Sequence, residues 1–348
     1  AHLIHSACTK LGTKALIVVA NEALAKVLYD DLDYLDRGNV LLFPQTDLLF
    51  YDVEAAGRDI KKRRLNVLDS LRRQEKHVIT TAEALCSVTV SFEQYEKYSL
   101  SISVGDELDY EEFLKRLVTL GYRREELVEG AGQFSARGGI VDFFPEWSEM
   151  AYRVEFFDTE VDSIRLFDAE SQRASDQVAT ARLTPAQEIL LDDDTRAALI
   201  SKIGKLYKKS AAANLDDETK DKLLRNLKRD EERLREKISF PSLCKYIPYI
   251  YGKEKPTLLD YIPKDYLVFW DDPPRLHEAA ESAVQNLAAT VTEMLSRGVI
   301  AENAKEGYFS DFRRMIKRLT ERRFVGMGAL TYASPDYSPR KLISFTTK

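Results

Sequence analysis

The first part of the chain alternates between short apolar runs and longer segments with a helical period. Apolar runs typical of buried strands stand at 14–21, 39–44 and 77–85, the last opening directly into a helix. Between them, apolar residues recur every three or four positions in 22–35 and 58–74, which predicts amphipathic helices. Asn21 is a suitable N-cap for the first helix. Apolar strands separated by helices predict a parallel, doubly wound sheet.

The pattern changes near residue 100. The segment 108–122, "LDYEEFLKRLVTLGY", predicts one short helix, with Asp109 at its start and Gly121 at its end. After it, 132–168 alternates apolar and polar residues with a period of two, which predicts three antiparallel strands. One helix packed on such strands is an α+β module.

Helical and strand patterns of the first kind return after residue 183. Two charged helices with narrow apolar stripes are expected at 192–209 and 216–238, and we expect them to lie as a solvated pair on a surface. A buried strand follows at 265–272, then a long helix that begins with proline at 273. The segment 338–348 is either a last strand or a linker.

The predicted fold class is therefore α/β: a doubly wound, mostly parallel sheet domain, split in sequence by the inserted α+β module. We assign 1–99 to the first half of the α/β domain, 100–182 to the module and 183–348 to the second half.

The period of two also predicts which side chains of the module face outward. In "AYRVEFFD" (151–158), Tyr152, Val154 and Phe156 should face the helix, which turns Arg153 and Phe157 away from it. The same alternation in "GQFSARGG" turns Arg137 outward. Arginine and exposed aromatic residues are enriched where proteins bind one another. From the pattern alone, Phe157 is either part of such an interface or covered by another part of the protein.

Composition narrows the class of protein. With 44% hydrophobic and 31% charged residues and a net charge of −6, the sequence is that of a globular protein without a global basic field. Three widely separated cysteines fit a reducing cytoplasm and, with four scattered histidines, predict no metal site. No apolar run is long enough for a membrane span. The helix-like start at Ala1, without methionine, predicts a fragment of a longer protein.

The motifs of nucleotide chemistry are mostly missing. The phosphate loop G-x-x-x-x-G-K-[ST] does not occur in the sequence. The strand "LVFWDD" does end in Asp271 and Asp272, where P-loop enzymes hold Mg²⁺. Without a phosphate loop, we interpret this pair as a vestigial strand end that is merely solvated or caps a helix. No catalytic triad or cofactor motif stands out.

One predicted helix is strongly basic. Its first turns carry five cationic residues: Arg58, Lys61, Lys62, Arg63 and Arg64. Such a helix can follow the phosphates of DNA, although it is more often a solvated face with its apolar side turned inward. The sequence leaves both interpretations open.

The outward-facing stretch also carries a family resemblance. "FSARGGIVDFFP", "YRVEFFD" and "FDAESQR" resemble a segment shared by the family of the excision-repair protein UvrB and the bacterial transcription-repair coupling factors. "LLFPQTDLLFYD", "VITTAEAL" and "YIYGKEKPTLLDYIPKDYLVFWDDPPRL" resemble the coupling factors further. The damage-probing hairpin that UvrB carries has no room here, between strand and helix. The chain thus resembles the UvrB-like N-terminal region of the coupling factors.

This resemblance implies a function. In the coupling factors the inserted module recruits the excision-repair protein UvrA, and the contact positions of the family match Arg137, Arg153 and Phe157. The implied role is a non-catalytic recruitment module without a cofactor, which brings nucleotide excision repair to RNA polymerase stalled at damage. The rest of the parent protein would bind RNA polymerase and double-stranded DNA, and another of its domains would mask the same face. The rival is an ATP-dependent, damage-binding protein of the UvrB type, which a phosphate loop upstream of Ala1 would favour.

Overall fold

The structure is a computed structural model that describes residues 1–46, 48–52, 57–301, 307–328 and 341–343. One part of the molecule is built on a five-stranded sheet in the order β13-β12-β1-β3-β2, in which every neighbouring pair of strands is parallel. The strands are β1 (Ala15–Val19), β2 (Val40–Phe43), β3 (His77–Thr81), β12 (Leu267–Asp271) and β13 (Arg323–Met327). The α/β class predicted from the sequence is confirmed. The segment 338–348 lies mostly outside the described residues.

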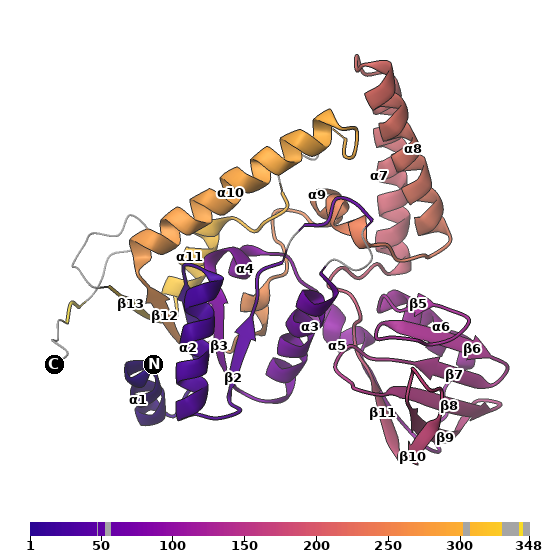
Figure 1. The fold of residues 1–348 in the computed structure, drawn as a ribbon, viewed down its shortest axis with the longest axis horizontal. Coiled ribbons are helices and arrows are strands. Elements are labelled where there is room, and N and C mark those ends of the chain that lie inside the picture. Colours follow the sequence, from indigo (N-terminus) through magenta and orange to yellow (C-terminus); the bar gives the residue numbers. More distant parts are fainter. Residues whose placement is uncertain (47, 53–56, 302–306, 329–340, 344–348) are drawn as a thin grey trace.

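Helices cover both faces of this sheet, as a doubly wound fold requires. One face packs on α1 (His2–Leu11) and α2 (Glu22–Leu35). The opposite face packs on α3 (Arg58–Arg73), α4 (Ala82–Cys86), α10 (Pro273–Ser296) and α11 (Phe312–Thr320). The Asn21 side chain accepts a hydrogen bond from the Leu24 N–H, so the predicted N-cap of α2 is confirmed. Figure 1 shows these helices around the sheet.

The other part of the molecule is built on a six-stranded sheet in the order β10-β9-β8-β7-β6-β5. Its strands are β5 (Arg123–Arg124), β6 (Gln133–Arg137), β7 (Ile140–Phe143), β8 (Ala151–Phe157), β9 (Glu160–Phe167) and β10 (Ala174–Gln177). The stretch 132–168 thus forms four strands, and the prediction of three was wrong. The tight Gly138–Gly139 turn separates β6 from β7 but barely interrupts the alternation.

A short helix closes the inner face of the six-stranded sheet. This is α6 (Tyr110–Thr119), capped by the Asp109 carboxylate, which accepts from the Glu112 N–H. Its Phe113 meets Phe143 and Phe156 of the sheet, with ring centroids 6.0 and 5.8 Å apart. Gly121 follows with a φ of 86°, a left-handed conformation that stops the helix as predicted.

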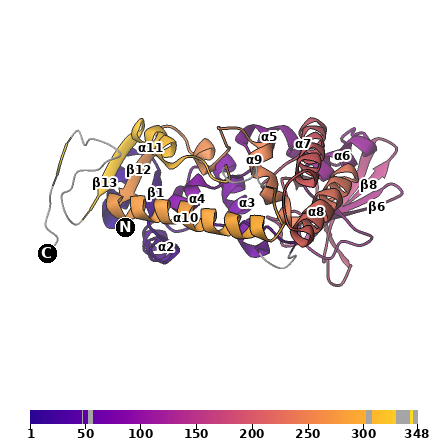
Figure 2. The same ribbon diagram turned by 90° about the horizontal axis from the view of Figure 1, so that it is seen from above.

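The segments that lead into and out of the six-stranded sheet lie side by side in a small sheet of their own. Strand β4 (Leu100–Ser103) pairs antiparallel with β11 (Thr180–Leu183), and α5 (Phe92–Tyr98) precedes β4. Seen from above, α3 lies between the two large sheets (Figure 2). The buried cores of both sheets form one continuous cluster.

Two charged helices stand away from the sheets. They are α7 (Asp193–Ala211) and α8 (Asp217–Arg235), and they pack on each other through buried residues such as Leu199, Ile203 and Leu227. Both were expected from the sequence, but the hairpin projects from the body rather than lying flat on it (Figure 1). The short helices η1 (Pro241–Tyr246), α9 (Ile247–Ile250) and η2 (Leu258–Tyr261) lead back to β12.

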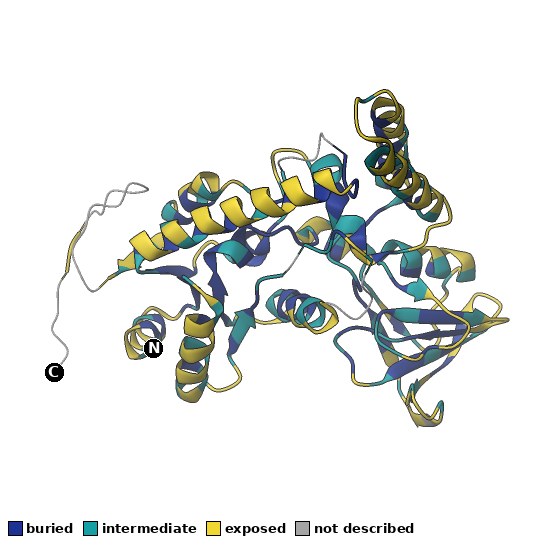
Figure 3. Cartoon of the chain, turned by 45° about the horizontal axis from the view of Figure 1, so that its top comes forward, coloured by how far each residue is buried: buried dark blue, intermediate teal, exposed yellow. Residues whose placement is uncertain are grey.

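The long helix α10 runs along the part of the molecule that holds the parallel sheet and ends near the α7–α8 hairpin, with much of its surface in solvent (Figure 2). Its two ends contribute the buried residues Leu276 and Met294, whereas the middle turns are largely exposed (Figure 3). Among the described residues, no helix combines the length and apolar character needed to cross a bilayer.

A buried histidine ties the first strands together. The Nδ1 atom of His77 accepts a hydrogen bond from the Ala15 N–H at 3.1 Å, and its Nε2 lies 3.2 Å from the Asp36 carboxylate. This geometry requires the neutral ring, because Nδ1 has to carry a lone pair. Burial and the nearby Lys14 cation together lower the pKa of His77 to about 4.

We therefore expect stability to fall as the pH falls from about 6.5 to about 4, because only the unfolded chain takes up this proton easily. The full shift corresponds to about 3 kcal/mol of unfolding free energy. His77→Asn keeps an acceptor for Ala15 and should flatten the pH dependence measured by urea unfolding. His2→Asn, at an exposed position of α1, is the control. A parent protein equally stable at both pH values would contradict this account.

Candidate functional site

The outer face of the six-stranded sheet is the candidate site. On β8, Tyr152 and Val154 are buried toward α6, and Arg153 lies on the opposite face, across from Asp142 of β7. Arg137 lies on the same outer face of β6, next to the hairpin turn. The outward orientation predicted for both arginines is confirmed.

A buried carboxylate organises these arginines. Asp142 is 1% exposed, and its two oxygens accept hydrogen bonds from the Arg153 Nε and Nη2 atoms, both at 2.7 Å. The Arg137 guanidinium lies 3.6 Å from the same carboxylate. The hydrogen bonds to Asp142 raise the pKa of Arg153 despite its partial burial. Sequence reasoning missed this aspartate, although its place opposite Arg153 in the alternation could have indicated it.

Arg153 is less exposed than the sequence suggested. Its side chain is 23% exposed, against 57% for Arg137, and its guanidinium stacks 4.9 Å from the centre of the Phe167 ring. Removal of Arg153 alone would leave the buried Asp142 charge without its main partner, and such changes are destabilising. The Arg153 guanidinium is therefore held in place, and only part of it is exposed to solvent.

Phe157 is the most exposed member of the predicted site. Its exposed fraction is 77%, whereas its neighbour Phe156 is half-buried against Tyr110 and Phe113 of α6. A register shift between β8 and β9 follows Glu155, where Phe156 pairs with Val161. The predicted alternation nevertheless holds through Phe157, which lies beyond the Glu155–Ile140 pair at the rim of the outer face.

The turn beside Phe157 depends on glycine. The Gly139 carbonyl accepts a hydrogen bond from the Phe156 N–H at 2.7 Å. A Cβ at Gly139 would stand 2.8 Å from the Phe156 carbonyl oxygen, which is closer than real Cβ atoms come. Ile140 follows the turn and is 38% exposed, so it adds a second apolar side chain to the outer face.

The basic helix α3 buries one of the five cations that could have faced DNA. Arg64 is fully buried, and its guanidinium binds Glu188 at 2.8 Å, the Pro44 carbonyl and the Ser87 hydroxyl. Lys61 is 2.9 Å from Glu146, which is itself buried. The prediction was wrong for Arg64, because the charge lies on the side of α3 that packs on other elements.

The remaining predicted cations lie nearer to solvent. Arg58 and Arg63 are exposed, Lys62 is half-buried, and Arg63 pairs with Asp59 one turn away at 2.7 Å. An intrahelical pair of this kind is typical of a solvated helix surface.

The acidic strand end stands apart from the outer face. Asp271 ends β12, and Asp272 adopts a left-handed conformation before α10, with its N–H donated to the Met327 carbonyl. Burial and the neighbouring Asp272 raise the pKa of Asp271. Arg275 lies 3.8 Å from Asp272 beside a hollow of about 370 Å³. In the described part of the chain, no group of three or more potential ligands could hold a metal ion.

The chain is similar in sequence to one known domain family and to several known proteins. The UvrB interaction domain family matches residues 100–189, which include the six-stranded sheet. The transcription-repair-coupling factor of Bacillus subtilis is 32% identical over 292 residues, which cover 83% of this chain and 25% of that protein. Its counterpart in Staphylococcus haemolyticus is 30% identical over 293 residues, covering 82% and 24%. The resemblance noted in the sequence is confirmed. The chain spans about a quarter of the length of the curated relatives it matches.

The two neighbouring phenylalanines should differ sharply in stability experiments. Phe156→Ala removes a half-buried ring and should cost about 2–3 kcal/mol, somewhat less than a fully buried phenylalanine. Phe157→Ala removes an exposed ring and should change the unfolding free energy by less than about 0.5 kcal/mol. Thermal melts of both variants would measure this, and the reverse order would show that the register of β8 is wrong.

Proposed function

We propose, from the kinship of this chain with the transcription-repair-coupling factors, that it is a non-catalytic recruitment module that binds the excision-repair protein UvrA. The match to the UvrB interaction domain supports a protein-binding role for residues 100–189. Binding would bring nucleotide excision repair to RNA polymerase stalled at DNA damage.

The observation that carries this proposal is the composition of the outer face. An exposed phenylalanine lies on the same face as two arginines that are held on one buried aspartate. An aromatic ring can insert into an apolar pocket, and the arginines can donate charge-assisted hydrogen bonds to carboxylates. Asp142 and Phe167 restrict Arg153 before binding, so less side-chain entropy is lost on association.

The rest of the parent protein would supply the other partners. RNA polymerase and double-stranded DNA would bind outside this chain, and a further domain would mask the Phe157 face until repair begins. Residues 1–99 and 183–348 would form the split α/β domain, with 100–182 as the inserted UvrA-binding module. The pairing of β4 with β11, which brings residues 100 and 183 together, supports these boundaries. A cytoplasmic location follows from the same role.

The alternative is an ATP-dependent, damage-binding protein of the UvrB type. The sequence contains no phosphate loop, and the acidic strand end is joined by an arginine rather than by further metal ligands. The described structure of α3 also gives no continuous basic surface, because Arg64 and Lys61 are engaged internally. These features favour the recruitment role.

ATP hydrolysis distinguishes the two functions. The purified chain should release no phosphate from ATP above a mock preparation, with or without double-stranded DNA. The Asp271→Ala/Asp272→Ala variant should behave identically. Turnover that DNA stimulates and this double variant abolishes would favour the alternative.

Binding of UvrA tests the recruitment role directly. Phe157→Ala should cost about 2 kcal/mol or more, which is roughly a thirtyfold loss of affinity, with an unchanged melt. Arg137→Ala should also weaken binding. For Arg153, the double variant Arg153→Ala/Asp142→Asn removes the guanidinium without leaving a buried charge unpaired.

Titration of labelled UvrA by fluorescence anisotropy would give these affinities. Arg297→Ala is the control. Arg297 directly follows α10, away from the module, and pairs with Glu293 in the last turn of that helix. If all the outer-face variants bind as tightly as the parent chain, the site lies elsewhere.

A further inference from the structure

The six-stranded sheet has an edge that is only partly covered. Strand β5 pairs with β6 through only Arg123 and Arg124, opposite Gln133 and Phe134. The Glu125 N–H then donates to the Phe134 carbonyl at 2.9 Å, and the chain turns away. The end of β6, from Ser135 to Arg137, therefore has a neighbouring strand on the β7 side only.

The register decides which groups face this edge. The Phe144 N–H donates to the Gln133 carbonyl, and Ser135 and Arg137 follow as the residues whose main-chain groups face β7. The N–H and carbonyl of Ala136 consequently face the other way. Within residues 57–301, no hydrogen-bond partner lies opposite these two groups. Both remain able to pair with an added strand.

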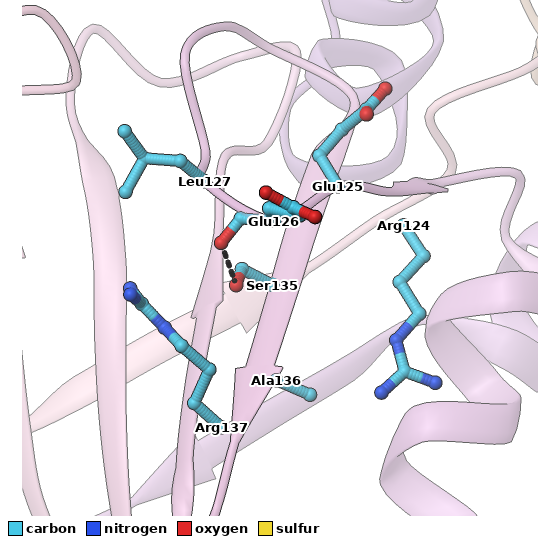
Figure 4. A pocket seen from close by; sticks show the side chains of 7 residues that line it. All are labelled: Arg124, Glu125, Glu126, Leu127, Ser135, Ala136 and Arg137. Atoms are coloured by element: carbon cyan, nitrogen blue, oxygen red, sulfur yellow. Dashed lines mark hydrogen bonds between the residues drawn. The ribbon is translucent and has the colours of Figure 1, made fainter.

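A hollow lies beside these unpaired groups. Its volume is about 740 Å³, and its lining consists of Arg124, Glu125, Glu126, Leu127, Ser135, Ala136 and Arg137. Figure 4 shows Leu127 and Arg137 on one side of β6, and Arg124 and Ala136 on the other. The Ser135 hydroxyl donates to the Glu126 carbonyl at 2.9 Å, which fixes the path of the segment that leaves the edge uncovered.

We propose that a short extended segment of the protein bound by the outer face adds to this edge of β6 as a further strand. This inference rests on the proposed recruitment function and extends its interface around the sheet edge. Main-chain hydrogen bonds to Ala136 would supply part of the affinity, as in other cases of strand addition. The edge is continuous with the outer face, because Arg137 lines the hollow and also contacts Asp142.

The charges indicate which segment fits. Successive side chains of an added strand point to opposite faces of the sheet. One would meet Arg137 on the outer face, and the next would meet Arg124 on the α6 side. One acidic residue beside Arg137 and the next beside Arg124 would pair with these two cations, whereas Glu125 and Glu126 of the lining disfavour any further acidic residue. Leu127 offers an apolar contact near Arg137.

Replacement of Ala136 by proline is the central test. Proline removes the N–H and places its ring where an added strand would pair, and proline is tolerated at strand edges that face solvent. Ala136→Pro should weaken binding of UvrA at least about tenfold and melt close to the parent chain. The matched control is Ala136→Val, which has a similar volume but keeps the N–H, and it should bind within about threefold of the parent.

The second variant is Arg124→Glu, which lies off the outer face. It should weaken binding at least about fivefold if the segment passes the α6 side of the edge. An outer-face contact alone predicts no effect from this change. Amide hydrogen exchange of the parent chain adds a measurement without mutation, since the Ala136 amide should exchange more slowly in the presence of UvrA.

The outcomes separate the two proposals. If Phe157→Ala loses affinity while Ala136→Pro and Arg124→Glu bind normally, strand addition is wrong and the recruitment role stands. Equal losses for Ala136→Pro and Ala136→Val would also overturn it, because the N–H would then be irrelevant. If Ala136→Pro does not fold, unchanged exchange at Ala136 on binding overturns the inference. A parent chain that does not bind UvrA overturns both.

Discussion

Burial of the Arg64 guanidinium is the constraint on which the arrangement of the two large sheets depends. A buried cation is tolerated only where hydrogen-bond acceptors surround it. Here they come from the end of β2, the end of α4 and Glu188, which follows β11. The Phe43 ring lies 4.0 Å beneath the guanidinium. Because these acceptors are far apart in sequence, satisfying Arg64 fixes α3 against both the parallel sheet and the chain that leaves the module.

A second buried charge on α3 strengthens this junction. Asp69 is 1% exposed and accepts two hydrogen bonds of 2.9 Å from Arg182 of β11, the strand that leaves the six-stranded sheet. Tyr95 of α5 donates to the same carboxylate at 3.1 Å. Loss of Glu188 would leave the buried Arg64 cation uncompensated, which is far more costly than the loss of a surface ion pair. Asp69 has a further cation, Arg73, at 2.9 Å. The charged face of α3 therefore joins the two parts of the molecule.

The same principle shapes the outer face. Asp142 is a buried charge whose partners, Arg153 and Arg137, reach toward solvent. Its need for partners holds two cations on the same face of the sheet as the exposed Phe157. The side chains that give the surface its binding character are thus oriented by a carboxylate that a partner would scarcely touch. The β6 edge continues this surface, since Arg137 belongs to both.

The sequence by itself determined the local structure and much of the candidate site. Alternation with a period of two placed Arg137, Arg153 and Phe157 outward, because neighbouring side chains of a strand point to opposite faces. The helical period and the capping residues located α2, α3 and α6, because both signals come from residues close together in the sequence. What only the tertiary structure decided were contacts between distant residues. The ion pair of Arg64 joins residues 124 positions apart, so the basic pattern of α3 could not reveal that its cation is buried. The contact of Asp142 with Arg153 and the open edge at Ala136 likewise depend on strand pairing. Pairing decides which side chains lie opposite each other and which main-chain groups are left without a neighbouring strand.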